Sequence, residues 1–430
     1  MSSEFISVKL RNQNLAINQS DDKRYVGCEF NRAISACLLI LCLPIIIVNT
    51  LLAVLQKKSV LLQIRQKDCL GRVVEYYHFN SGVMKSIAVL GAVFSKRISL
   101  CGMPINIKLT SENRAMLSRY RYIPAGLFDA LTVHQSGGLH TRDKVVLLEK
   151  QFAGTRTSYI ILLLRGVLSQ LIFKGQNSHL TCPKVFYLFG LKINNDSMAN
   201  AIDWLMTNPK RKTIKQRCKV SFFVNVNSVN LAQKHPQFKA HLNQADHCFA
   251  DGIGMRIAAR KSGVQLKGNL NGTDMLPHLC KAAVEKDMSI YLLGGKPSIA
   301  EATAHNLCQQ YPGLRIAGSE HGYFEPDSHL EVIKRINESQ ADILLLAMGS
   351  PTQEKWLIQH ANLINCQTAL AVGGLFDFYS GRISRAPLWM RELGMEWVWR
   401  LIQEPKAKFN RYIIGNPLFL IRTFILNQAS

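Results

Sequence analysis

The stretch SFFVNVNSVNLAQKHPQFKAHLNQADHCFADGIGM, residues 221–255, decides the fold. An apolar run over residues 220–226 has the length of a buried strand, and a helical pattern follows over residues 229–242. A second short strand, residues 248–250, leads into the turn Asp251-Gly252. A strand, a helix and a second strand in this order predict neighbouring strands of a parallel sheet.

Polar side chains stand where these two strands end. Asn225 and Asn227 end the first strand, and Asp251 follows the second. The carboxyl ends of parallel strands share one edge of the sheet, where open α/β sheets bind ligands, so these side chains are expected to lie together. Asp251 is therefore predicted to be the chemical centre.

The alternation of strands and helices continues along the chain from residue 184. Further strands are expected at residues 185–191, 289–293, 315–319, 341–348 and 369–372. Further helices are expected at residues 194–204, after residue 274 up to Glu285, and at residues 298–311. This pattern predicts an α/β fold, a Rossmann-like and mostly parallel sheet with helices on both faces.

Several of the expected strands end in glycine, at Gly252, Gly294-Gly295, Gly349 and Gly373-Gly374. Glycine lets a backbone approach a ligand closely, and a following helix N-terminus favours phosphate, so four such turns suggest a nucleotide-diphosphate site. The alternative is that each glycine only makes a tight turn. No Walker A or GxGxxG sequence occurs, which removes the main support for ATP or NAD.

The composition limits the partners. The 430 residues carry a formal net charge of +23 at pH 7, which predicts an anionic partner. No zinc-finger spacing or aromatic RNA-binding motif is present, so a membrane surface or a pyrophosphate is favoured over nucleic acid. Eleven scattered cysteines without CxxC predict reduced thiols in a cytoplasmic setting and no metal site.

The N-terminal part contains a long apolar segment. Residues 1–25 are polar and are expected to be a mobile tail without the features of a signal peptide. Residues 34–55, ISACLLILCLPIIIVNTLLAVL, are long enough to cross a bilayer, but Pro44 lies in the middle and basic residues flank both ends. A segment that bends at Pro44 and returns to the same face, and a tilted single span, both fit.

This N-terminal part resembles the bacterial monotopic phosphoglycosyl transferases. The resemblance lies in residues 30–71, ending in QIRQKDCLG, and in SLCGMP at residues 99–104, which is similar to the family's SLVGPRP. The family's catalytic Asp-Glu pair falls on Lys85-Ser86, and a lysine cannot replace the nucleophilic aspartate. Residues 26–180 are therefore expected to form an α-rich, membrane-associated module without its own activity. Residues 158–173 are expected to be an amphipathic helix, interfacial or in the core, rather than a span, and residues 174–183 a linker.

The rest of the chain is similar to the WecG/TagA/CpsF glycosyltransferases. The motifs that carry this similarity, in the family's order, are ADGIGMRIAAR, LNGTDML, YLLGGKPSIAEA, HGYF, LLLAMGSPTQEKWL, AVGGLFDFYSGRISRAP and GMEWVWRLIQEPKAKFNRY. The resemblance implies inverting transfer of N-acetylmannosamine, its uronate or a related hexose from UDP to polyprenyl-diphosphate-linked N-acetylglucosamine. It places the transferase domain at residues 184–396, with no cofactor.

Inverting transfer needs one base to accept the proton of the attacking hydroxyl, and Asp251 falls on the family's proposed base. The alternative role for Asp251 is a helix cap. Asn225 and Asn227 would bind substrate hydroxyls or form turns, and Asn225 replaces the threonine usual in the family.

Further residues are expected around the donor. Gln353 would bind the donor sugar or base, whereas Glu354 could be only a helix N-terminal charge. Arginines would meet the pyrophosphate, because the absence of Asp-x-Asp argues against a metal ion there. The other residues expected to line the cleft are Asn271, Thr273, Asp274, Asp377, Arg382 and Arg385.

Residues 397–430 are basic and aromatic, which is typical of a membrane interface. In the family this appendage helps to complete the active site, and Arg400 and Arg411 match its basic positions; Ala407 stands where an arginine is common. A packed helix pair is the alternative. The whole pattern predicts an enzyme at the cytoplasmic face of the inner membrane. A bifunctional initiating transferase, a non-catalytic assembly scaffold and a homo-oligomeric state stay open.

Overall fold

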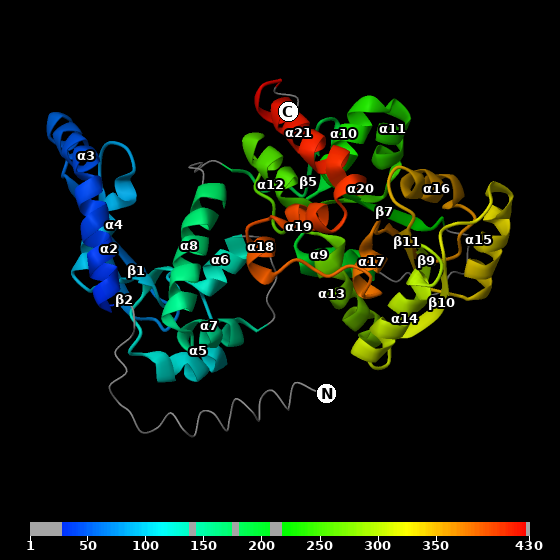
Figure 1. Cartoon of the computed structure of the whole chain (residues 1–430), viewed down its shortest axis with the longest axis horizontal. Helices are drawn as coiled ribbons and strands as arrows, with labels where there is room; N and C mark the ends of the chain where they lie inside the picture. Colours follow the sequence, from blue (N-terminus) through cyan, green and yellow to red (C-terminus); the bar gives the residue numbers. More distant parts are fainter. Residues whose placement is uncertain (1–27, 137–142, 174–179, 207–216, 427–430) are drawn as a thin grey trace. The chain divides into compact units, whose positions relative to one another are not determined.

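The computed structural model describes residues 28–136, 143–173, 180–206 and 217–426 (Figure 1). The chain divides into two compact units. The first comprises residues 1–134 and 141–171, and the second comprises residues 135–140 and 172–430. The expected N-terminal tail and most of the expected linker lie outside the described residues.

Two apolar helices begin the described part of the first unit. α2 (Cys28–Leu41) and α3 (Leu43–Leu55) meet at a bend of 63° (Figure 1). Pro44 is the second residue of α3, where its missing N–H costs no helical hydrogen bond, so the expected bend lies beside the proline. Among the described residues no single helix is long and apolar enough to span a bilayer. The bent pair meets that criterion by length and composition.

The remainder of the first unit mixes helices with two small sheets, so it is α-rich but not purely helical. β1 (Leu61–Lys67) pairs antiparallel with β2 (Val73–Phe79), and β3 (Ser99–Cys101) pairs parallel with β4 (Gly126–Phe128). The helices are α4 (Val89–Phe94), α5 (Ser111–Leu117), α6 (Ala130–Ser136), α7 (Lys144–Phe152) and α8 (Arg156–Phe173).

An eight-stranded sheet forms the centre of the second unit, in the order β10-β9-β11-β12-β7-β8-β6-β5. Every neighbouring pair is parallel except β5 and β6, which confirms the predicted mostly parallel sheet. The strands are β5 (Val185–Leu188), β6 (Leu191–Asn194), β7 (Lys219–Val224), β8 (His247–Ala250), β9 (Ser289–Gly294), β10 (Arg315–Glu320), β11 (Ile343–Ala347) and β12 (Thr368–Ala371).

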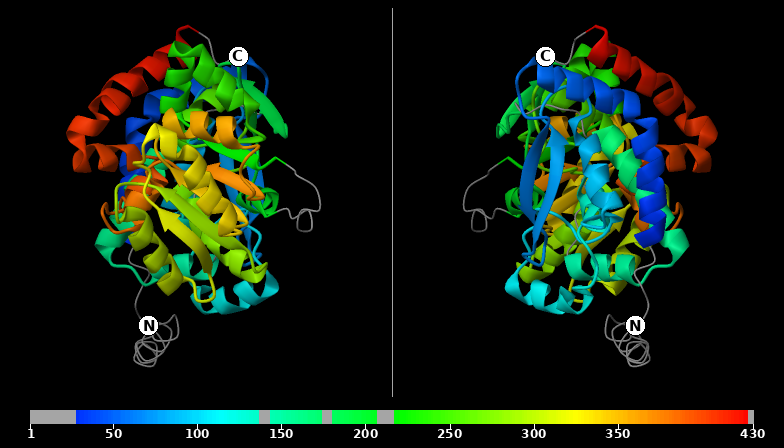
Figure 2. Two further views of the ribbon diagram at one scale, coloured as in Figure 1. Left: turned by 90° about the vertical axis from the view of Figure 1, so that its right-hand side faces the viewer. Right: turned by 90° about the vertical axis from the view of Figure 1, so that its left-hand side faces the viewer.

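Helices cover both faces of this sheet (Figures 1 and 2). Successive side chains of β7 show why: Phe222 packs into the hydrophobic cluster on one face and Phe223 into the cluster on the other. The helices are α9 (Met198–Leu205), α10 (Val226–Lys234), α11 (Pro236–Gln244), α12 (Gly252–Lys261), α13 (Gly272–Glu285), α14 (Ile299–Gln310), α15 (His329–Glu338), α16 (Thr352–His360), α17 (Leu375–Tyr379) and α18 (Leu388–Glu392).

Two expected elements were wrong in detail. Residues 185–191 do not form one strand, because Phe189 and Gly190 adopt positive φ angles of 55° and 71° and turn the chain back into the hairpin β5–β6. Residues 229–242 do not form one helix, because Pro236 cannot donate a helical hydrogen bond; α10 ends at Lys234 and α11 begins at the proline.

The C-terminal segment consists of α19 (Glu396–Gln403), α20 (Pro405–Phe409), a π-helical turn (Asn410–Ile414) and α21 (Gly415–Phe424). α21 packs on α10 and α12, with Phe419 buried among their side chains. Asn230 of α10 donates to the Gly415 carbonyl at 2.8 Å and accepts from Arg422 at 2.7 Å. The segment that was expected to be an appendage is therefore attached to the helices that follow β7 and β8.

Candidate active site

Four neighbouring strands deliver the expected site residues to one edge of the sheet. In the order β11-β12-β7-β8, these strands are followed by Gly349, Gly373, Asn225 and Asp251. Val224 and Ala250, the last residues of β7 and β8, are register partners, and the Asp251 amide donates to the Val224 carbonyl at 2.9 Å. Asn225 and Asp251 therefore lie side by side, as the sequence predicted.

Asn225 connects the start of α10 to Asp251. Its Oδ1 caps the helix by accepting from the amides of Asn227 and Ser228 at 3.1 and 3.2 Å. Its Nδ2 donates to Oδ2 of Asp251 at 3.2 Å. Asp251 stands at the N-cap position of α12 but makes no side-chain capping hydrogen bond, so the structure does not give it the alternative role of a helix cap.

The surroundings of Asp251 raise the pKa of its carboxyl group toward neutral pH. Burial raises the pKa of Asp251 to about 6, while the Asn225 hydrogen bond and the charge of Arg411 act in the opposite direction. Two further carboxylates, Glu396 and Asp274, add to the rise. A carboxylate with a pKa near 6 is ionised at pH 7 and basic enough to accept a proton from a hydroxyl group in a transition state.

The turn after Asp251 is held by a residue that the sequence did not single out. Gly252 has φ +87°, and its amide donates to Oδ1 of Asn269 at 3.0 Å. A Cβ atom at Gly252 would meet no atom within 4 Å, so this side of the turn is open. Asn269 lies inside the segment GNLNGTD that marked this region, but its sequence position gave no sign of the contact with Gly252.

Asp274 is the centre of an ion-pair cluster. Asn271 caps α13 and donates to Asp274 at 2.7 Å, and Arg385 contacts both Asp274 and Glu396. Burial acts to raise the pKa of Asp274, but the charges of Arg385 and Arg391 and the hydrogen bonds from Asn271 and Arg385 together outweigh it, so this pKa lies below its usual range. Arg385 thus forms ion pairs with two carboxylates in the structure. Thr273 contributes its backbone carbonyl, which accepts from Tyr379 at 2.9 Å.

Gln353 joins two of the glycine turns. Its Oε1 accepts from the amides of Gly349 and Gly373 at 3.2 and 3.0 Å, and its Nε2 donates to Glu354 at 3.0 Å. Only 4% of Gln353 is exposed. These two amides are occupied by Gln353, and they are therefore not free to bind phosphate. The expected direct contact between Gln353 and the donor stays a prediction.

Two other glycines serve backbone packing. A Cβ atom at Gly294 would lie 2.4 Å from the Ala347 carbonyl oxygen, and the Gly295 amide donates to that oxygen at 2.9 Å. The close approach of β9 and β11 thus requires glycine at position 294. By contrast, a Cβ atom at Gly349 would meet open space.

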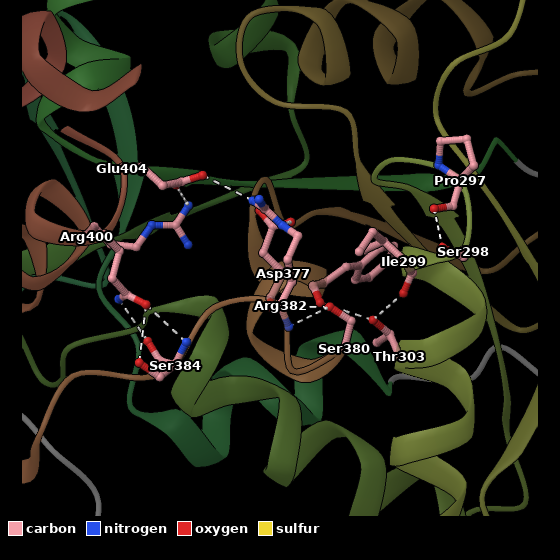
Figure 3. A network of polar contacts seen from close by, with 12 residues as sticks. Pro297, Ser298, Ile299, Thr303, Asp377, Ser380, Arg382, Ser384, Arg400 and Glu404 are labelled. Carbon is pink, nitrogen blue, oxygen red and sulfur yellow. Dashed lines mark hydrogen bonds and ion pairs between the residues drawn. The ribbon is translucent and has the colours of Figure 1, made fainter. Parts of the chain in front are cut away.

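A group of charged side chains joins α17 and the following loop to the C-terminal helices (Figure 3). Arg382 pairs with Asp377 at 2.8 Å and with Glu404 at 3.1 Å. Arg400 pairs with Glu404 at 3.2 Å and stacks on Phe378, 4.7 Å from the ring centre. The same Arg400 guanidinium lies against Gly374, where a Cβ atom would be 3.0 Å away.

Lys408 and Arg411 extend this group toward Asp251. Lys408 lies 3.6 Å from Glu404, and burial followed by the charge of Arg400 lowers its pKa. Arg411 packs on the ring of Tyr412 at 5.3 Å. Within the described part of the chain, Nη1 of Arg400 and Nε of Arg411 are buried without a hydrogen-bond partner.

The charges in this group do not balance. The group contains four cations, which are Arg382, Arg400, Lys408 and Arg411, and two carboxylates, Asp377 and Glu404, while the charge of Arg411 also acts on the Asp251 carboxylate. A positive surplus with unused guanidinium donors is suited to an anion such as a pyrophosphate. We name these six residues the cationic cluster.

A comparison with known families fits this geometry. The model of the glycosyl transferase WecG/TagA/CpsF family matches residues 186–429, more than half of the chain. The chain belongs to the WecG/TagA/CpsF family. The match runs from β5 through α21 and includes every residue of the site described above. The protein is thus a glycosyltransferase of cell-surface polysaccharide synthesis, and it acts on a sugar donor and an acceptor.

The structure of this WecG/TagA/CpsF protein sorts the expected arginines into two kinds. Arg382 and Arg385 are each held by two carboxylates, whereas Arg400, which pairs with Glu404, and Arg411 each keep a nitrogen without a hydrogen-bond partner. Two of the four acids that make this difference, Glu396 and Glu404, were not predicted as site residues. Glu396 and Glu404 both lie within the quoted motif GMEWVWRLIQEPKAKFNRY, but only the folded chain shows which arginines they face.

Proposed function

We propose that the protein is an inverting glycosyltransferase that uses a UDP-sugar. The donor would carry N-acetylmannosamine, its uronate or a related hexose, and the acceptor would be a polyprenyl-diphosphate-linked N-acetylglucosamine. The observation that carries the proposal is the position of Asp251. A partly buried carboxylate with a pKa of about 6 lies at the carboxyl edge of the sheet, with Arg411 of the cationic cluster close enough to influence it.

The proposed reaction is a single displacement. Asp251 accepts the proton of the acceptor hydroxyl while the hydroxyl oxygen attacks the anomeric carbon. The bond from that carbon to the β-phosphate oxygen breaks, and UDP leaves with the electron pair. Arg400 and Arg411 are the residues expected to meet its charge, because their donors are unused in the structure. Asn227, Asn271 and Thr273 stay candidates for sugar contacts.

The first unit is proposed to hold the enzyme at the cytoplasmic face of the inner membrane, where a polyprenyl acceptor lies. α2 and α3 expose large apolar side chains, among them Leu41 at 75% and Leu55 at 79%. Lys85, at the position of the phosphoglycosyl transferase nucleophile, donates to the Asn80 carbonyl at 3.1 Å. This unit would therefore act as an inactive anchoring module.

UDP release by the full chain in detergent tests the proposal. The donors are UDP-N-acetylmannosamine and a panel of other UDP-sugars, and the acceptor is a short-chain polyprenyl-diphosphate N-acetylglucosamine. We expect turnover by the wild type and by Lys85→Ala, and loss of turnover in Asp251→Asn. Acceptor-dependent turnover that survives Asp251→Asn would refute the assignment of the base, and a wild type inactive with every donor would refute the transferase proposal.

A further inference from the structure

The amide of Asn225 has a defined orientation. Three donors surround its Oδ1: the amides of Asn227 and Ser228, and the Ser228 hydroxyl at 3.3 Å. The oxygen must therefore face α10, and the NH2 group must face β8. There it donates to Oδ2 of Asp251, and no other side chain that the structure describes makes a hydrogen bond to this carboxylate.

A helix cap alone does not require asparagine at this position. Serine, threonine and aspartate cap helices about as well, because capping uses only an acceptor. What asparagine adds is a second functional group, a neutral donor that reaches the neighbouring strand end. The two roles occupy opposite ends of one planar amide, so the capping interaction fixes the direction of the donor.

We propose that Asn225 is the positioning residue for the base Asp251. This inference rests on the proposed function. Asn225 holds Oδ2 of Asp251, so that Oδ1 is the oxygen that takes the proton of the acceptor hydroxyl. It also favours the ionised form of the carboxylate, against burial and against the nearby charges of Glu396 and Asp274. Asn225 then acts through Asp251, rather than by binding substrate hydroxyls as its sequence position suggested.

The decisive variant is Asn225→Asp, which keeps the size and the capping oxygen but replaces the donor with a carboxylate oxygen. Two carboxylates about 3.2 Å apart cannot both ionise easily. The amides of Asn227 and Ser228 favour the negative charge at position 225, so the pKa that rises is that of Asp251. We expect the acid limb of kcat/KM to move up by about two pH units, from about pH 6 to about pH 8. At pH 7 we expect kcat to fall at least tenfold, with a smaller change in the donor KM.

Two further variants separate positioning from capping and from added charge. Asn225→Thr keeps a capping hydroxyl, and its acid limb is expected to lie between those of the wild type and Asn225→Asp. Asn200→Asp adds the same charge at an exposed site on α9 and is expected to leave the pH profile unchanged.

A measurement without turnover makes the test independent of the substrate. The melting temperature of Asn225→Asp is expected to fall more steeply than that of the wild type between pH 5 and pH 8, because the two carboxylates repel each other when ionised. Adding Asp251→Asn is expected to remove the extra slope. Absence of this coupling would overturn the inference, as would an Asn225→Asp pH profile like that of the wild type.

The outcomes distinguish the inference from the proposed function. A rise in donor KM with an unchanged pH profile would show that Asn225 binds substrate and would overturn the positioning role. A wild type inactive with every donor, together with coupling between positions 225 and 251 in unfolding, would refute the transferase proposal while supporting the contact. Coupling between positions 225 and 251 in unfolding, together with a shifted pH profile of Asn225→Asp, supports both the positioning role of Asn225 and the proposed transferase function.

Discussion

The side-chain amide of Gln353 donates to Glu354, and this contact turns the Gln353 oxygen toward two backbone amides. Glu354 is 1% exposed, and its Oε1 also accepts from Ser350 at 2.7 Å. The turns after β11 and β12 are thus held by one buried side chain. A residue that the motif suggested as a donor contact has a framework role in the folded chain.

Replacing Gln353 tests this framework role. Gln353→Ala leaves the amides of Gly349 and Gly373 without their acceptor, so we expect the free energy of unfolding to fall by about 2 kcal/mol. Chemical denaturation measures the change. A direct donor contact without a framework role would instead raise the donor KM at unchanged stability.

The rate is expected to depend on the ionisation of Asp251. Because burial raises its pKa to about 6 and the base must be ionised, kcat/KM should decrease about tenfold per pH unit below pH 6. A pH–rate profile between pH 4.5 and 8 measures this limb. If the acid limb lay near pH 4 instead, the role of burial at Asp251 would be contradicted.

Stability is expected to change with the same ionisation. The folded-state pKa of about 6 lies above the ordinary aspartate value of 3.8, so the folded state binds the proton more tightly. The associated stability is present below about pH 4 and is lost as the pH rises through 6. Asp251→Asn should therefore be more stable than the wild type at pH 8, by up to about 3 kcal/mol, and similar at pH 4. Unfolding curves at both pH values decide this, and equal stabilities at pH 8 would contradict it.

The two kinds of arginine should respond differently to substitution. Arg385→Gln removes the partner of Asp274 and Glu396, so we expect a loss of about 3 kcal/mol in the free energy of unfolding. Arg411→Gln removes a guanidinium whose Nε has no partner in the described structure, so we expect little loss of stability but about a 100-fold lower kcat. Measuring the unfolding and the turnover of both variants tests the distinction. A large loss of stability in Arg411→Gln, together with unchanged stability in Arg385→Gln, would refute it.

The attachment of α21 can be tested at Phe419. This ring is 1% exposed and lies 5.3 Å from the ring of Phe189, so Phe419→Ala should cost about 3 kcal/mol. The matched control is Phe424→Ala on the same helix, since Phe424 is 52% exposed and should change stability little. Thermal unfolding of both variants measures the difference. Equal effects would contradict the packing of α21 on α10 and α12.

The sequence by itself determined the class of the sheet and the meeting of Asn225 with Asp251. Alternating apolar strands and helices require parallel strands, and parallel strands place their carboxyl ends at one edge. The local sequence pattern was sufficient to predict this contact, because Asn225 and Asp251 directly follow two neighbouring strands. The sequence also indicated the bend beside Pro44, because the effect of a proline on a helix is local.

Only the tertiary structure decided which charges neutralise one another. Arg385 meets Asp274, which lies 111 positions earlier in the chain, and Arg382 and Arg400 share Glu404. Nothing in the spacing of these residues predicts the pairs, because they depend on how the C-terminal helices return to the sheet edge. The same is true of Gln353, whose partners lie at the ends of two strands. The sequence motifs indicated which residues lie near the site. The three-dimensional contacts showed which of these residues stabilise the site and which have polar groups left to bind a ligand.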